Sequence, residues 1–143
     1  GLKRTENLLL ANEQLRRRFS ATVAYDRFTF SANTSLHFVM LLQAIEGELP
    51  VQTISFVEPA MIKRFYLASY GLIDYLIKIV DRAVWLVQVQ DLVGIELPVL
   101  AQAFEDEVWS YATEDRNPFS ASFNFQPLFG KREPFETFEE SST

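Results

Sequence analysis

Residues that could carry catalysis or bind a metal are few in this chain of 143 residues. The sequence contains no cysteine and one histidine, His37, so it has neither a thiolate nucleophile nor a pair of His or Cys metal ligands. No serine and aspartate are placed to make His37 a general base, and a polar residue at the start of a helix is the favoured interpretation. The five glycines are scattered and form no phosphate-binding loop. The sequence therefore predicts no cofactor, no metal and no catalytic residue, and favours a protein that is not an enzyme.

One set of charged residues does fall on a single helical face. Asp74, Lys78 and Asp81 follow one another at intervals of four and three residues, and Arg64 lies ten residues before Asp74 on the same face. Such a polar stripe can hold ion pairs, or it can line a pocket in which Lys78 lies between two acids. Structural ion pairing is the favoured interpretation. A helical small-ligand-binding protein or enzyme built on Asp74 and Lys78 is kept as an alternative.

Two short runs of like charge are the remaining candidates. A nucleic acid or an acidic partner could be contacted by the run of Arg16, Arg17 and Arg18. The chain has a net charge of -6, however, which favours a solvated face near a helix end over binding to a phosphate backbone. The run from Glu105 to Glu107 is also predicted to be a solvated face, because consecutive residues on a helix do not converge on one substrate atom.

The element that must position the polar stripe is the stretch from Pro59 to Asp91. It is apolar over most of a helical circumference, which predicts one long helix surrounded by other helices. Proline at the first position of a helix loses no hydrogen bond, so Pro59 marks its start. A transmembrane helix is rejected, because Asp74, Lys78 and Asp81 near its middle would each cost roughly 3 kcal/mol to insert.

Shorter elements are predicted on both sides of this helix. Apolar residues recur at helical intervals from Thr5 to Tyr25, from Leu36 to Glu48, and from Pro98 onward, where Leu100, Phe104, Val108 and Tyr111 form the apolar face. Arg27–Ser31 and the β-rich Val51–Glu58 are predicted to be extended, and Leu92–Leu97 to be a turn. The predicted fold is therefore mainly α: a helical bundle around one long central helix (about 59–91), with a small β element.

The C-terminal residues differ in composition from this helical domain (residues 1–115). Between Phe119 and Phe129, apolar and polar residues alternate, which predicts an extended, amphipathic arm over residues 116–143. Exposed aromatic rings are usually covered, so we expect the arm to dock on the helical body, on a second copy or on another protein. The partner-binding residues predicted on this basis are Phe119, Phe123, Phe125, Phe129, Phe135 and Phe138.

One resemblance concerns residues Ile54–Val80. A short β-rich piece that ends in proline is followed by an aromatic helix with Tyr70 and Asp74, a layout similar to that of regulatory proteins carried on integrating conjugative elements. The resemblance covers less than a third of the chain. It implies a DNA-associated regulatory protein, which would use Arg16–Arg18, as an alternative function.

The favoured hypothesis is a non-catalytic structural, adaptor or assembly subunit that acts through protein–protein contacts of the aromatic arm. Its predicted partner is another protein or a second copy of the chain, and nucleic acid is not favoured. The absence of cysteine favours an intracellular, cytoplasmic location. Because the sequence begins at Gly1 without a methionine, an upstream targeting segment is allowed for.

Overall fold

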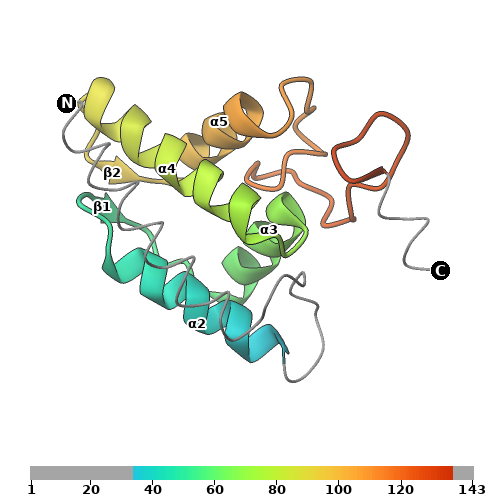
Figure 1. Cartoon of the computed structure of the whole chain (residues 1–143). Helices are drawn as coiled ribbons and strands as arrows, with labels where there is room; N and C mark the ends of the chain where they lie inside the picture. Colours follow the sequence, from blue (N-terminus) through green and yellow to red (C-terminus); the bar gives the residue numbers. More distant parts are fainter. Residues whose placement is uncertain (1–33, 137–143) are drawn as a thin grey trace.

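The computed structural model describes residues 34–136, which form four helices and a two-stranded sheet (Figure 1). Residues 108–135 continue through turns and irregular segments, and we call residues 116–136 the described arm. The predicted mainly α fold is confirmed. In chain order the elements are α2 (Thr34–Gly47), β1 (Gln52–Thr53), α3 (Pro59–Ser69), α4 (Ile73–Val89), β2 (Gly94–Ile95) and α5 (Leu97–Glu107).

Several predicted features lie outside the described residues. They are the helix Thr5–Tyr25, the basic run Arg16–Arg18, the extended segment Arg27–Ser31 and Phe138.

The stretch predicted as one long helix is divided into α3 and α4, so that prediction is corrected (Figure 1). Tyr70 and Gly71 have positive φ angles of 52° and 75°, a conformation that ends a right-handed helix. The Ser69 hydroxyl donates to the Phe65 carbonyl at 2.8 Å and accepts from the Gly71 N–H at 3.2 Å. The Leu72 N–H then donates to the Ser69 carbonyl at 3.0 Å, and α4 begins at the next residue. Side chains of α3 and α4 therefore do not share one helical face.

The two strands come from segments on either side of this helix pair. They are parallel, with Gln52 opposite Gly94 and Thr53 opposite Ile95, and the Ile54 N–H donates to the Ile95 carbonyl at 3.0 Å. A Cβ at Gly94 would lie 2.6 Å from the Gln52 carbonyl oxygen, so the strands can approach this closely only with glycine there. The segment predicted as a turn therefore contains β2, because pairing with β1 extends its backbone.

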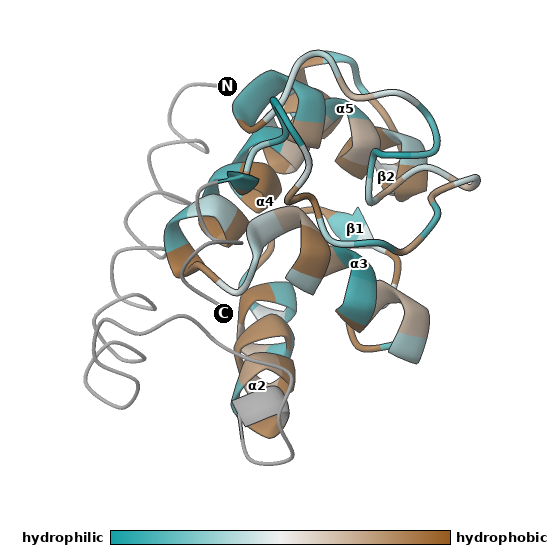
Figure 2. Cartoon of the chain, turned by 90° about the vertical axis from the view of Figure 1, so that its right-hand side faces the viewer, coloured by the Kyte–Doolittle hydropathy of each residue, from teal (hydrophilic) through white to brown (hydrophobic). Residues whose placement is uncertain are grey.

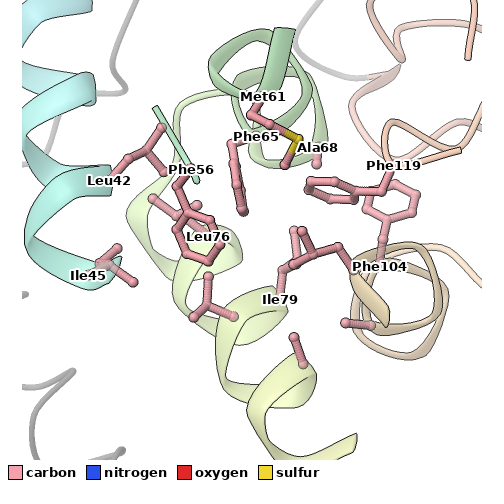
Figure 3. Close-up of a cluster of buried hydrophobic side chains, with 14 of the residues drawn as sticks. Leu42, Ile45, Phe56, Met61, Phe65, Ala68, Leu76, Ile79, Phe104 and Phe119 are labelled. Carbon is pink, nitrogen blue, oxygen red and sulfur yellow. The ribbon is translucent and has the colours of Figure 1, made fainter. Parts of the chain in front are cut away.

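The hydrophobic core surrounds α4, which contacts α3, α5 and β2 and lies between α2 and α5 in both overall views (Figures 1 and 2). Hydrophobic residues predominate along α2 in Figure 2, and Phe38, Leu41, Leu42 and Ile45 of this helix are buried. Figure 3 shows Leu42 and Ile45 reaching the core from one side and Phe104 from the other, with Phe65 between them. Among residues 34–136, no helix combines the length and apolarity needed to cross a membrane.

The end of α5 differs from the prediction. Leu100 and Phe104 are buried as predicted, but the helix ends at Glu107 and Val108 is only partly buried. Tyr111 lies beyond the helix with 84% of its surface exposed. The periodic apolar spacing continues past the point where the backbone stops being helical, so the prediction for Tyr111 is wrong.

Candidate functional site

The described arm packs on the helical body through its phenylalanines. Phe119 is buried against Phe65 of α3, with ring centroids 5.0 Å apart, and Figure 3 shows its ring directed into the core near Ala68 and Phe104. Phe135 is fully buried and contacts two tyrosines, Tyr70 in the helix break and Tyr75 in the first turn of α4. Its ring lies 5.5 Å from Tyr70 and 5.6 Å from Tyr75.

The break between α3 and α4 creates the position that receives the end of the arm. Tyr70, the residue with the left-handed backbone, also meets Phe129 edge to face at 4.8 Å. If α3 continued as helix, the Tyr70 side chain would project in another direction. The same irregularity that divides the predicted long helix therefore positions a docking partner for the arm.

Polar contacts connect the beginning of the arm to α5. The Asn117 side chain is buried, and its Nδ2 donates to the Ala101 carbonyl at 3.0 Å and to Oε2 of Glu105 at 3.1 Å. Its Oδ1 accepts from the Phe119 N–H at 3.0 Å, and the Ser120 N–H donates to the Asn117 carbonyl at 2.9 Å. These bonds fold residues 117–120 into a turn. The described arm is therefore not the continuous extended segment that its alternation predicts.

Arg64 is an arm contact and not a member of a stripe on α4. Its Nη1 donates to the carbonyl oxygens of Pro118 at 2.9 Å and Ser120 at 2.6 Å, and its guanidinium carbon lies 4.9 Å from the centroid of the Phe125 ring. Desolvation by partial burial lowers the pKa of Arg64 from its usual range. A cation that satisfies two backbone carbonyls and an aromatic face holds this turn against α3.

A second arginine closes the described arm on itself. Arg116 donates through Nε to Oε2 of Glu133 at 2.6 Å, and its Nη2 donates to Oε1 of the same carboxylate. Partial burial raises the pKa of Glu133, but hydrogen bonds from Arg116 and the Gly130 N–H, together with the Arg116 charge, bring it below its usual range overall. This two-point pairing joins the two ends of the described arm.

Among the predicted arm residues that the structure describes, Phe125 is the most exposed. It keeps 37% of its surface exposed, whereas Phe119, Phe123 and Phe135 are buried and Phe129 is partly buried. Phe125 also has a φ of 58°, an uncommon backbone conformation for a bulky residue. It is supported by Arg64 on one side and by Phe123, whose ring centroid lies 5.1 Å away.

A groove runs between α5 and the first turn of the arm, with a volume of about 670 Å³. Its walls are mainly apolar, and the charged residues that line it are Glu105 and Glu114. Glu105 was predicted to be solvated, but it contacts Asn117 and faces this groove. The lining residues are Leu97, Pro98, Ala101, Gln102, Glu105, Ala112, Thr113, Glu114, Asn117, Phe119, Ser120, Ala121 and Ser122.

The α4 part of the predicted polar stripe faces a smaller cavity against α5. Lys78 and Asp81 line this cavity of about 190 Å³, together with Arg82, Trp85 and Glu107. Asp74 is exposed and is not among the lining residues, and Arg64 lies on α3. The four predicted stripe residues therefore do not form one site.

The chemistry of this smaller cavity is that of an ion pair beside a half-buried carboxyl. Arg82 donates from Nε to Oε2 of Glu107 at 2.9 Å, and its guanidinium lies 4.8 Å from the centroid of the Trp85 ring. Oδ1 of Asp81 is buried and makes no hydrogen bond. Burial, together with the charge of Glu107, raises the pKa of Asp81 to about 6. This carboxyl can exchange a proton near neutral pH, but none of the described lining residues is a serine, cysteine or histidine that it could activate.

Sequence reasoning missed most of the residues that organise these sites. Asn117 had a usable signal, because Asn followed by Pro commonly begins a turn. No signal in the sequence indicated Arg116 and Glu133, because they pair across 17 residues of irregular chain. His37 is exposed near the start of α2, and among residues 34–136 no three His, Cys, Asp or Glu side chains are grouped to hold a metal.

Comparison with known proteins identifies no relative: no protein-family model, curated protein or solved structure matches this chain.

Proposed function

We propose that this protein is a non-catalytic adaptor or assembly subunit that acts through protein–protein contacts of its C-terminal arm. The observation that carries the proposal is Phe125, a half-exposed aromatic ring in a left-handed backbone conformation. Such a conformation costs on the order of 1–2 kcal/mol for a residue other than glycine, and strained residues cluster at functional sites. Large aromatic side chains are also enriched among the residues that dominate interface energies.

The way the arm is held supports the same proposal. Phe119 and Phe135 seat it on the body, and Arg64 supports the Phe125 ring from behind. A contact residue that is already ordered loses little conformational entropy when a partner binds. The proposed contact surface is therefore the outer side of the arm around Phe125.

The remaining predicted arm residues have a different role in this proposal. Phe119, Phe123 and Phe135 are buried within the chain itself, so they would support the contact surface and not touch the partner. A partner that bound these rings directly would have to displace the arm from the body.

The experiment compares the full chain with Phe125→Ala and Phe125→Asn. Asparagine tolerates the left-handed backbone, so Phe125→Asn removes the ring and preserves the local conformation. The control is Tyr111→Ala, which removes an aromatic side chain that is 84% exposed and precedes the arm. Sedimentation velocity reports self-association, and quantitative mass spectrometry of affinity-purified chain reports other partners.

We expect the wild-type chain and Tyr111→Ala to form the same complex. Both Phe125 variants should bind the partner at least tenfold more weakly. Far-UV circular dichroism should stay unchanged in all variants. The proposal is wrong if the wild-type chain is a monomer with no specific co-purifying protein, or if the Phe125 variants retain the complex.

A further inference from the structure

The groove between α5 and the arm has the size of a binding site. Its volume of about 670 Å³ lies within the range of roughly 300–1,000 Å³ that is usual for ligand sites. Its two walls are joined through the buried Asn117, which bonds to Ala101 and Glu105 on α5 and to Phe119 in the arm. The groove is therefore formed by fixed elements before any ligand is present.

The side chains along the groove favour a ligand with a long apolar portion. Apolar surface comes from Leu97 and Pro98 at one end of the α5 wall and from Ala121 in the arm, above the buried Phe119. Small side chains at Ala101, Ala112, Ser120, Ala121 and Ser122 leave the space between the walls open. Polar groups also line the groove: the Gln102 amide, whose Nε2 donates to Asp106 at 2.8 Å, and the Ser120 and Ser122 hydroxyls, which lie 3.2 Å apart. Their remaining acceptor capacity suits the N–H groups of a polypeptide backbone.

The charge of the groove selects for a cation. Glu105 and Glu114 line it, and none of its lining residues is a lysine, arginine or histidine. The nearby Arg64 and Arg116 are committed to backbone carbonyls and to Glu133. Of the two Glu105 oxygens, Oε2 accepts from Asn117, and the same carboxylate lines the groove. The overall charge of -6 adds a long-range attraction for basic ligands.

We propose that this groove binds a short basic and apolar segment of a partner protein, with a lysine or arginine side chain directed at Glu105. The aliphatic stem of such a side chain packs on apolar walls while its charged end reaches a carboxylate. The neighbouring apolar residues of the segment would occupy the space beside Ala101 and Ala121. This site is separate from the Phe125 surface and does not depend on it.

The test uses the full chain and a positional-scanning library of hexapeptides, with binding read by fluorescence anisotropy. We expect the strongest binders to contain lysine or arginine next to leucine, isoleucine, valine or phenylalanine. Affinity for the best peptide should fall as salt is raised, because the Glu105 contact is partly exposed and screened.

Substitutions locate the binding in the groove. Glu105→Gln keeps an oxygen that can accept from Asn117 but removes the charge, and should weaken the best peptide about tenfold. Ala121→Trp fills the groove from an exposed position and should weaken it by a similar factor or more. Glu48→Gln, an exposed residue that follows α2, makes the same change in net charge and should have no effect.

Phe125→Ala distinguishes this inference from the proposed function. Peptide binding that survives Phe125→Ala and is lost in both groove variants supports the groove site. The inference is overturned if no hexapeptide binds, if the library shows no preference for basic residues, or if Glu105→Gln and Ala121→Trp bind as the wild type does. Loss of binding only in Phe125→Ala would also overturn it and would place the peptide on the Phe125 surface.

Discussion

Replacement of Asp81 by asparagine should stabilise the protein. The gain should appear only at a pH that is high enough to ionise the aspartate of the wild type. Asp81 lies on α4 beside Glu107 of α5, with Oδ1 buried and without a hydrogen bond. Burial is the larger cause of its raised pKa and the charge of Glu107 is the second, whereas Arg82 acts in the opposite direction. Folding therefore places an ionised carboxylate in surroundings that disfavour its charge.

Whether the stability rises or falls with pH follows from the number of protons that the folded and the unfolded states bind. The pKa of Asp81 is raised from 3.8 to about 6 on folding, so between these values the folded state holds more protons than the unfolded state. Stability consequently falls as the pH rises through this window, and the loss is complete above the folded pKa. The difference corresponds to roughly 3 kcal/mol in full. Because Asp81 is only half-buried, solvent screening reduces the expected effect to about 1 kcal/mol.

Asparagine is nearly isosteric with aspartate and carries no charge at any pH. Asp81→Asn should raise the free energy of unfolding by about 1 kcal/mol at pH 8, a shift of about 4 °C in Tm, and by much less at pH 4.5. Urea unfolding followed by far-UV circular dichroism at both values measures the difference. The control is Asp91→Asn, an exposed position with a φ of 54° that asparagine also tolerates.

Two outcomes would contradict the predicted stabilisation by Asp81→Asn. If Asp81→Asn destabilises the protein at pH 8, the carboxylate is stabilised by its surroundings, and attraction to Arg82 outweighs burial. If the variant is equally stabilising at both pH values, the gain comes from packing or hydrogen bonding of the amide and not from removal of charge.

Two further predictions concern the arm. Phe135→Ala removes a fully buried ring that contacts Tyr70 and Tyr75, so it should lower the free energy of unfolding by about 3–5 kcal/mol in urea titrations. Phe125→Ala, at a half-exposed position, should cost less than half as much, and equal losses would show that the arm end is not seated in the core. Arg64→Met removes both hydrogen bonds to the Pro118 and Ser120 carbonyls and should speed amide hydrogen exchange across residues 117–125, with a stability loss of about 1–3 kcal/mol. Lys63→Met, at an exposed neighbouring position on α3, is its control, and unchanged exchange in the Arg64 variant would contradict the proposed support of the arm.

Most helix positions were predictable because their signals are local. Pro59 begins α3, Pro98 lies in the first turn of α5, and Gly47 ends α2, each within a residue or two of the predicted boundary. Proline and glycine act through their own backbone geometry, so their effect can be read without knowledge of the rest of the fold.

The break at Tyr70 and Gly71 was not predictable from the same kind of signal. A glycine inside an apolar run is compatible with a continuous helix at a cost of about 1 kcal/mol. The break is favoured here by the Ser69 hydroxyl bonds and by the packing of Phe129 and Phe135 on Tyr70. Those phenylalanines lie about 60 residues further along the chain, beyond the reach of any local pattern.

In the candidate sites, too, local patterns were predictable and contacts between distant residues were not. The alternating phenylalanines of the arm indicated that it would be covered, but not which rings would be buried and which exposed. Arg64 was assigned to a stripe with Asp74, Lys78 and Asp81, and the helix break separates it from them. Glu105 and Glu107 were predicted to be solvated, and α5 instead places one against Asn117 and the other against Arg82.

The sequence by itself determined the mainly α class, the starts of α3 and α5 near Pro59 and Pro98, the end of α2 at Gly47, and the presence of an aromatic segment that must be covered. These properties depend on the conformational preferences and apolar surface of residues close together in the chain. Only the tertiary structure decided where the central stretch breaks, which side of the arm faces outward, and which carboxylates meet an arginine, an asparagine or an open groove. Each of these depends on contacts between residues far apart in sequence, whose energies exist only once the chain has folded.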